Sequence, residues 1–411
     1  MKKEKHIMII AGEPSGDLHG ASLIKELRKK DRSLIITGIG GELMEQAGMR
    51  LFFHIKDLSA MGVTEVIMQF KRIKEAFDLF REKVFFERPA LLILIDYPGF
   101  NLKAAAYAKK IKVSVLYYIT PKVWAWNRSR LKKIKQYVEH AALIFPFEDS
   151  IFKKENIPAT YVGNPLLDYY SEFYPETSQS QKKTPCIIGS PTVIAILPGS
   201  RESEISKLLE TMLKSAILIN QGLAHDINDA FIACDRDRGI NCEKKRNVQF
   251  LLSAASSVNI HKFNKILEPY NKNNMFEVVR GNPTELFRRC DLLIAASGTV
   301  TLEAAICGIP TVIVYKTSPL TYFLAKNFVR ISYIGLPNII AKYSILPELI
   351  QNDATPEKIS EQVLLMLNPE TLASIRKRLL MMTKCLGAAG ASERTAKLAI
   401  KMLNSSIALK K

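Results

Sequence analysis

The 411-residue sequence lacks any apolar run long enough to span a membrane, and its cysteines are few and dispersed. The apolar stretch from Ala90 to Ile95 has the length of a buried strand, whereas a membrane helix needs about 20 residues. The six cysteines form no C-x-x-C pair and have no neighbouring histidine, so neither a zinc site nor a disulfide framework is indicated. The apolar segment behind the basic N-terminus, Ile7 to Ala11, is too short for a signal peptide. We therefore expect a cytoplasmic protein without metal or cofactor.

Acidic residues are also scarce, since 40 Asp and Glu stand against 58 Lys and Arg, which gives a formal net charge of +18. The basic excess is concentrated in residues 103–135, with no acidic residue, and in residues 371–411, with one. Such surfaces attract phosphate on nucleic acid, on anionic lipids or on a small substrate. The alternative for either stretch is a solvated surface without a partner.

What the sequence does contain is an alternation of short apolar strands with helical segments, which predicts an α/β protein. After an initial strand that begins at His6, the expected strands are 34–38, 91–96, 113–119, 142–145, 192–197, 230–234, 276–279, 292–295 and 311–314. The polar segment 174–190 is expected to link a first domain, 1–173, to a second, 191–389. Two Rossmann-like, doubly wound parallel sheets facing a central cleft are therefore predicted, with ligands at the carboxyl ends of the strands.

The most informative segment places Ser297-Gly298-Thr299 between an apolar strand and the expected start of a helix. Free backbone N–H groups and the helix dipole at such a junction bind anions, and Gly298 permits close approach of a phosphate. Glu303 follows one helical turn after Thr299, where its carboxylate can accept hydrogen bonds from ribose hydroxyls. Neither a Walker A loop nor G-x-G-x-x-G is present, so this motif does not identify the nucleotide. The alternative is an ordinary strand-to-helix turn without a ligand.

Another candidate loop follows the first strand of the first half. In this loop Ser15, Gly16 and the early helix amides can hold a phosphate or sugar hydroxyls, and Glu13 can orient an acceptor. The alternative is that Ser15 is an N-cap and Asp17 a favourable charge in the first helical turn.

The corresponding loop of the second half is Leu197-Pro-Gly-Ser-Arg201. Here Gly199 and Ser200 can open toward a phosphate, and Arg201 can neutralise a departing diphosphate. A surface arginine paired with Glu202 or Glu204 is the alternative.

Asp96 is the candidate catalytic base. It ends a strongly apolar strand, and Pro98 and Gly99 turn the chain beside it. Partial desolvation there raises the proton affinity of a carboxylate, which suits a general base. The alternative is an aspartate that caps the next helix or anchors the turn.

Two aromatic segments remain open to more than one interpretation. Trp124 and Trp126, the only tryptophans, lie among basic residues and suit a sugar face, an acyl chain, an interface or simple core packing. Residues 66–84 form an amphipathic helix whose apolar stripe suits the core or an anionic membrane.

Taken in order, these motifs resemble lipid-A-disaccharide synthase, a bacterial inverting glycosyltransferase family of the GT-B fold. The resemblance rests on segments that span most of the chain: 11–21, 38–41, 95–101, 123–126, 145–148, 162–165, 197–201, 296–299 with Glu303, and 336–338. The chain departs from the usual family pattern at Asn164, Gly99, Lys122, Asn127 and Lys342-Tyr343.

The resemblance implies transfer of the sugar of UDP-2,3-diacylglucosamine to the 6-hydroxyl of 2,3-diacylglucosamine 1-phosphate, giving a β-1,6 disaccharide and UDP without a metal. It implies that Asp96 is the base, that Arg201 and the 297–299 helix start stabilise the leaving UDP, that Glu303 holds the ribose, and that Asn338 belongs to the donor site. It also implies peripheral association with the anionic inner membrane. In this family a C-terminal helix, here about 390–411, returns to the first domain and can be exchanged in a homodimer.

Two other kinds of function are considered. One is a different UDP-sugar enzyme of the same architecture, a 2-epimerase or an N-acetylglucosaminyltransferase, against which the first-half loops argue. The other is a non-catalytic basic protein that binds RNA or membranes, which would leave Asp96, Arg201 and Glu303 without a purpose. We therefore expect an enzyme whose partners are the two sugar substrates, without nucleic acid.

Overall fold

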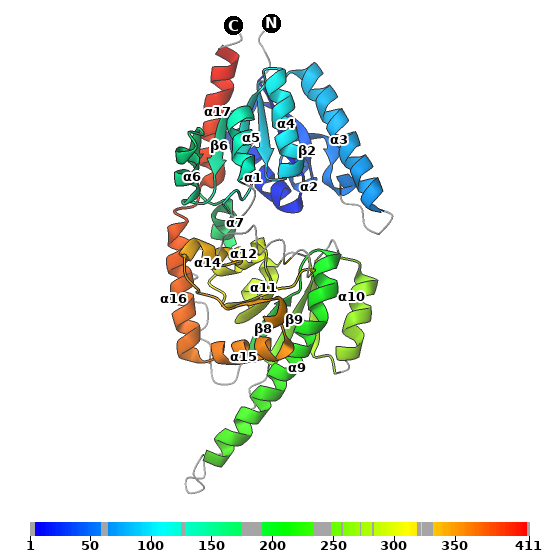
Figure 1. Cartoon of the computed structure of the whole chain (residues 1–411), viewed down its shortest axis with the longest axis vertical. Coiled ribbons are helices and arrows are strands. Elements are labelled where there is room, and N and C mark those ends of the chain that lie inside the picture. Colours follow the sequence, from blue (N-terminus) through cyan, green and yellow to red (C-terminus); the bar gives the residue numbers. More distant parts are fainter. Residues whose placement is uncertain are drawn as a thin grey trace. The chain divides into compact units, whose positions relative to one another are not determined.

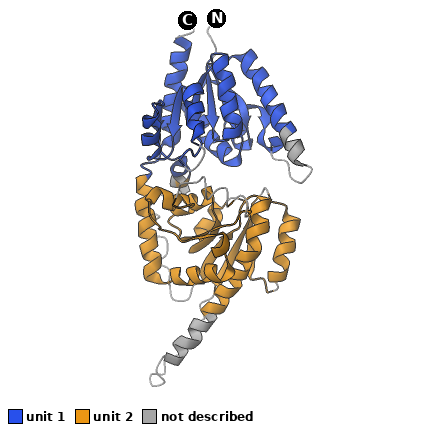
Figure 2. Ribbon diagram, in the orientation of Figure 1, with its two compact units in different colours: residues 1–169, 386–411 blue, residues 170–385 orange. Residues whose placement is uncertain are grey.

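The computed structural model describes ten stretches of the chain, which divide into two compact units (Figures 1 and 2). Unit 1 contains residues 1–169 and 386–411, and unit 2 contains residues 170–385. The predicted linker, 174–190, lies outside the described residues. The described residues are 5–58, 65–124, 128–173, 191–233, 248–255, 258–271, 273–281, 283–318, 322 and 332–408.

Unit 1 is built on a seven-stranded parallel sheet with the order β3-β2-β1-β4-β5-β6-β7. Its strands are β1 (His6–Ala11), β2 (Ile35–Gly40), β3 (Arg50–His54), β4 (Leu91–Ile95), β5 (Ser114–Tyr118), β6 (His140–Leu143) and β7 (Ala159–Tyr161). The helices described with it are α1 (Pro14–Lys30), α2 (Glu42–Gln46), η1 (Ile55–Leu58), α3 (Glu65–Glu87), α4 (Pro98–Lys110), α5 (Ser129–Tyr137), α6 (Glu148–Lys154), α7 (Pro165–Phe173), which crosses the unit boundary, and α17 (Ala391–Ala408).

Alternate residues of each central strand belong to opposite cores of unit 1, as the two-residue period of a strand requires. Ile7 and Ile9 of β1 pack in one core together with residues of α1 and α17. Met8 and Ile10 pack in the other core with residues of α3, α4 and α5. A strand buried on both faces is apolar throughout, which is why a parallel sheet could be predicted here. Figure 2 colours α17, which is red in Figure 1, as part of unit 1 together with the N-terminal elements.

Unit 2 repeats this architecture with a six-stranded parallel sheet of order β10-β9-β8-β11-β12-β13. Its strands are β8 (Thr192–Leu197), β9 (Val248–Ala254), β10 (Phe276–Arg280), β11 (Leu292–Ala296), β12 (Thr311–Tyr315) and β13 (Glu348–Ile350). The helices described with it are α9 (Glu202–Ala233), α10 (Ile260–Leu267), η2 (Glu268–Tyr270), α11 (Thr284–Arg289), α12 (Thr299–Ile306), α14 (Leu336–Ala341), η3 (Gln351–Asp353), α15 (Pro356–Met366) and α16 (Pro369–Cys385).

One predicted strand is wrong. The segment 230–234 was expected to be a strand, but its described part belongs to the end of the long helix α9. Periodicity does not separate a short apolar run in a strand from one in a helix, which explains the error. The structure also adds four strands that the sequence did not reveal, β3, β7, β9 and β13.

The amphipathic helix predicted at 66–84 is α3. Phe80 and Val84 are fully buried in the core of unit 1, and Ile73 and Phe77 pack against it. Core packing therefore explains this part of the stripe, while the side chains of residues 65–70 lie outside the description. Among the described helices, none is both long and apolar enough to cross a membrane.

Candidate active site

Asp96 comes directly after β4, the middle strand of the unit 1 sheet, and its backbone is firmly held. Its N–H donates to the carbonyl oxygen of Tyr118 at 3.3 Å. Its own carbonyl oxygen accepts from Tyr117 Oη at 2.8 Å and from Asn101 Nδ2 at 2.7 Å. Asp96 and Tyr97 both have a φ of 44°, a left-handed conformation that costs a non-glycine residue about 1–3 kcal/mol. Strain of this kind persists only where neighbouring contacts impose it, and it is common at active sites.

The surroundings of the Asp96 carboxyl raise its pKa from 3.8 to about 6. Burial is the largest cause because it disfavours the charged form, and the nearby Glu13 carboxylate acts in the same direction. The positive charges of Lys122 and Arg130 oppose the rise. A carboxyl of this pKa is mostly ionised at neutral pH and is more basic than an ordinary aspartate, as a general base requires.

The loop after β1 contacts the Asp96 loop. A Cβ on Gly12 would overlap the ring of Tyr97, so only glycine permits this approach. Glu13 follows in an extended conformation as the N-cap residue of α1. The predicted acceptor-side residue Glu13 therefore lies where its charge acts on Asp96.

The start of α1 contradicts one of the two alternatives considered for this loop and agrees with the other. Ser15 is not the N-cap, because Glu13 occupies that position, and Ser15 and Gly16 lie in the first turn. Asp17 lies in the first turn of α1, as that alternative stated, and its buried side chain also caps the second helix, α2. Its carboxylate accepts hydrogen bonds at 2.7 to 3.1 Å from the N–H groups of Gly41, Leu43 and Met44.

In unit 2, the segment 297–299 forms the predicted junction of strand and helix. Gly298 is the N-cap residue of α12, and the space where its side chain would project is open. Ser297 is held by its N–H, which donates to the carbonyl oxygen of Val314 at 3.0 Å. The first N–H groups of a helix have no partner inside it, so this partly exposed start can receive an anion.

Glu303 lies one turn further along α12 and is paired with a residue that the sequence did not indicate. Tyr170 Oη donates to Glu303 Oε2 at 2.7 Å. Burial raises the pKa of the Glu303 carboxyl, and the hydrogen bond from Tyr170 opposes this rise. The contact fixes one carboxylate oxygen and leaves lone pairs of the other for a ligand.

The loop after β8 is closed on itself by Glu204. Gly199 has a φ of 120°, and a Cβ there would overlap the Glu204 carboxylate. The N–H groups of Ser200 and Arg201 donate to Glu204 Oε2 at 3.0 and 3.3 Å. The Arg201 side chain is 69% exposed, and its Nη1 lies 3.5 Å from Glu204 Oε1. The structure thus contains the Arg201–Glu204 pairing considered from the sequence, and a phosphate bound to these two amides would have to displace Glu204.

Asn338 is fully buried in α14, and both ends of its amide are used within unit 2. Its Oδ1 accepts from the N–H groups of Ile345 and Leu346 at 2.8 and 3.0 Å. Its Nδ2 donates to the Leu346 carbonyl oxygen and to Glu348 Oε1, both at 2.8 Å. Glu348 also accepts from the N–H groups of Ile334 and Gly335. These bonds make Asn338 an organiser of segment 334–348.

Three departures from the family pattern have identifiable local roles. Asn164 is buried, and its Oδ1 accepts from the N–H of Leu166 at 3.0 Å. Lys342 ends α14 with a φ of 66°, a conformation that favours the glycine more usual there. Lys122 lowers the pKa of Asp96.

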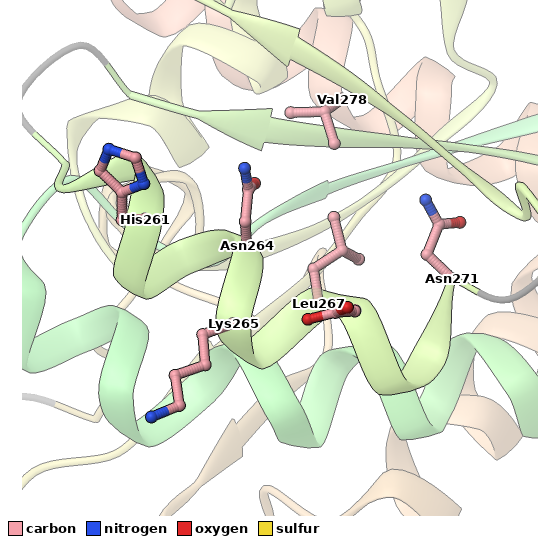
Figure 3. A pocket seen from close by; sticks show the side chains of 7 residues that line it. His261, Asn264, Lys265, Leu267, Asn271 and Val278 are labelled. Atoms are coloured by element: carbon pink, nitrogen blue, oxygen red, sulfur yellow. The ribbon is translucent and has the colours of Figure 1, made fainter.

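A surface pocket of about 540 Å³ in unit 2 lies elsewhere, along α10 and β10 (Figure 3). It is lined by His261, Asn264, Lys265, Leu267, Glu268, Asn271 and Val278. None of the predicted site residues contributes to it. Within the described stretches, no group of three or more His, Cys, Asp or Glu side chains is arranged to hold a metal ion.

Comparison with known proteins identifies the family. A family model described as lipid-A-disaccharide synthetase matches residues 7–401. The lipid-A-disaccharide synthase of Trichlorobacter lovleyi is 38% identical over 408 residues, which are 98% of this chain and 99% of that protein. The chain belongs to the lipid-A-disaccharide synthetase family. The resemblance drawn from the motifs is thereby confirmed. The protein is a glycosyltransferase of lipid A disaccharide synthesis.

Solved structures confirm the fold of this lipid-A-disaccharide synthetase family member. The UDP-GlcNAc 2-epimerase of Neisseria meningitidis, bound to UDP-GlcNAc, has a TM-score of 0.61 at 12% identity, covering 96% of this chain and 100% of that one. MurG of Acinetobacter baumannii has a TM-score of 0.55 at 14% identity, covering 97% and 99%. The two parallel-sheet units are of the GT-B type.

Proposed function

We propose that this enzyme transfers 2,3-diacylglucosamine from UDP-2,3-diacylglucosamine to the 6-hydroxyl of 2,3-diacylglucosamine 1-phosphate. The products are a β-1,6-linked disaccharide 1-phosphate and UDP. The observation that carries the proposal is Asp96, which directly follows the middle strand of unit 1 and has a pKa of about 6, in a chain of this family. We assign unit 1 to the acceptor and unit 2 to the UDP-sugar.

In this proposal Asp96 accepts the proton of the acceptor 6-hydroxyl while that oxygen attacks the anomeric carbon of the donor. The bond from the anomeric carbon to the diphosphate breaks on the opposite face, which inverts the configuration and releases UDP. Glu13, Ser15 and Gly16 surround the acceptor, and the charge of Glu13 keeps the Asp96 carboxylate basic. A single carboxylate suffices because inversion needs one displacement and no covalent intermediate.

The donor is held by unit 2. The N–H groups at the start of α12, with Ser297, Gly298 and Thr299, bind the diphosphate, and Glu303 accepts hydrogen bonds from the ribose hydroxyls. Tyr170 orients Glu303 for that task. Gly199, Ser200 and Arg201 stabilise the charge that develops on the leaving group, once the diphosphate has displaced Glu204 from the amides of Ser200 and Arg201.

Asn338 contributes to the donor site by organising segment 334–348, which lies next to Ser297. Ser297 Oγ donates to the carbonyl oxygen of Ile334 at 3.5 Å, so the segment borders the helix start directly. No metal is required in this mechanism, since the helix dipole and Arg201 supply the positive potential.

The test is product analysis with the purified full-length chain. We expect UDP release and a disaccharide 1-phosphate, identified by mass spectrometry, only when both acylated sugars are present. Turnover of UDP-N-acetylglucosamine without an acceptor would favour a 2-epimerase instead. Salt-sensitive RNA binding without any turnover would favour the non-catalytic basic protein.

We also infer that the enzyme associates with an anionic membrane surface. Phe85 and Phe86 at the end of α3 are 45% and 74% exposed, and the Arg88 guanidinium lies 5.0 Å from the Phe85 ring centre. Exposed aromatic rings beside a cation suit the headgroup region of a bilayer. Replacing both phenylalanines by Ser should reduce sedimentation with phosphatidylglycerol vesicles, whereas Leu365→Ser, at an exposed apolar residue of unit 2, should not. Equal sedimentation of all three proteins would contradict the assignment.

A homodimer with an exchanged α17 stays a prediction. In this chain α17 packs through Ala396, Ala399 and Leu403 into a core of unit 1. Light scattering would distinguish a dimer from the 46.3 kDa monomer.

A further inference from the structure

Glu148 is a buried carboxylate that the mechanism above does not use. It is 1% exposed at the start of α6, and three donors converge on it. The N–H groups of Ile144 and Phe145 donate to Oε2 at 3.2 and 3.0 Å, and the indole N–H of Trp124 donates to Oε1 at 3.2 Å. Burial raises the pKa of Glu148 to about 7, while these three hydrogen bonds and the charge of Lys122 oppose the rise.

The two oxygens of Glu148 have different tasks. Oε2 completes a local turn, because the Glu148 N–H also donates back to the Phe145 carbonyl oxygen at 3.1 Å. This reciprocal pair resembles half of a capping box and would need no further partner. Oε1 instead reaches Trp124, 24 residues earlier in the chain. A local cap does not explain the second bond.

Trp124 lies at the edge of the sheet where Asp96 lies. It follows β5, which pairs with β4 on one side and β6 on the other, and the carboxyl ends of parallel strands meet at one edge. Its ring contacts Phe145 and Phe147 edge to face, with centroids 6.0 and 5.2 Å apart. Trp124 is half-buried, so the residue is partly accessible. With its N–H donated to Glu148, the indole has only apolar surface to present to a ligand.

We propose that Glu148 is a positioning residue that holds Trp124 as an apolar wall for an acyl chain of the acceptor beside Asp96. This inference rests on the proposed function, because the acceptor is taken to be an acylated sugar phosphate. Glu148 itself is buried and touches no substrate. Its hydrogen bond prevents the indole from turning its N–H toward the acyl chain, where the donor would be left unpaired.

The inference is tested with Glu148→Gln and Trp124→Phe. Glutamine has one oxygen, which can keep the turn at Ile144 and Phe145, and its amide then faces the indole N–H with a second donor. Phenylalanine keeps an aromatic ring but lacks the N–H, and it leaves the turn intact. We expect either variant to raise the KM for the acceptor about tenfold, since leaving a buried polar group without its hydrogen-bond partner has an effect of that order, with the KM for the donor unchanged.

Two controls separate positioning from folding. The double variant should be no worse than either single variant, because both remove the same bond. The increase in KM should disappear with an acceptor analogue that carries only short acyl groups. Unchanged acceptor KM with a lowered Tm, or equal increases for donor and acceptor, would overturn the inference. If Glu148→Gln does not fold, the acceptor KM of Trp124→Phe decides alone.

Failure of the proposed function has a different signature. In that case the unaltered protein makes no disaccharide from the two acylated sugars, and the inference about Glu148 falls with it. If the unaltered protein is active but the two variants keep its acceptor KM, only the inference is refuted.

Discussion

Replacing Asp96 by Asn is expected to lower turnover and to increase stability at the same time. Loss of a general base reduces the rate by about 10²- to 10⁴-fold. The pKa of Asp96 is raised from 3.8 to about 6, so the folded state binds the proton more tightly than the unfolded state. The free energy of unfolding therefore falls as pH rises from about 4 to about 6. Such a rise in pKa corresponds to about 3 kcal/mol, reduced by the partial exposure of the side chain.

Asparagine is neutral at every pH, so it does not lose stability through ionisation of a buried carboxyl as the pH rises. Urea unfolding should therefore give equal stabilities for Asp96→Asn and the unaltered protein near pH 4, and a more stable variant at pH 7.5. Asp78→Asn is the matched control, since Asp78 is exposed on α3 and 3.9 Å from Arg81. It should change neither turnover nor the pH dependence of stability. A variant of Asp96 that is less stable at pH 7.5, or that keeps a near-normal rate, would refute the reasoning.

Three further predictions concern the same site. Arg201→Ala should weaken transition-state stabilisation by about 2 to 4 kcal/mol, measured as kcat/KM, and unchanged rate with unchanged UDP affinity would reject its role. Tyr170→Phe removes the donor to Glu303 and should raise the Kd for UDP about tenfold by calorimetry, whereas an unaltered Kd would show that Glu303 needs no such orientation. Lys122→Met should raise the pKa of Asp96 and move the acidic limb of the kcat/KM profile to higher pH, and a stationary limb would contradict the electrostatic coupling.

Strands buried on both faces could be predicted from the sequence. β8 begins and ends at the predicted residues, and β4 and β12 differ from prediction by one residue at one end. Their apolar runs are continuous because helices cover both sides of the sheet. β3, with largely half-buried residues, and β7, with three residues, carry weaker patterns and were missed. The wrong strand at 230–234 shows the limit of the same signal, since a short apolar run also fits a helix.

Some features of the candidate site could likewise be predicted from the sequence, and others could not. Gly298 caps a helix directly after a strand and Asp96 ends a strand, and both follow from their immediate neighbours in the chain. Asp17 lies in the first turn of its own helix, as one sequence alternative had it, but its bonds to a helix that begins 25 residues later were not foreseen. The partners Tyr170 of Glu303 and Glu148 of Trp124 were not indicated at all.

The amino-acid sequence by itself determined the fold class, the family and the loops that hold the candidate residues, because these depend on apolar runs and on turns between adjacent elements. Only the tertiary structure decided which side chains meet. Trp124 and Glu148 are 24 positions apart in the chain, and Tyr170 and Glu303 are 133 positions apart. The order of strands in a sheet brings such pairs together, and no local spacing encodes that order. The same holds for the pKa of Asp96, which is set by burial and by charges that arrive from other loops.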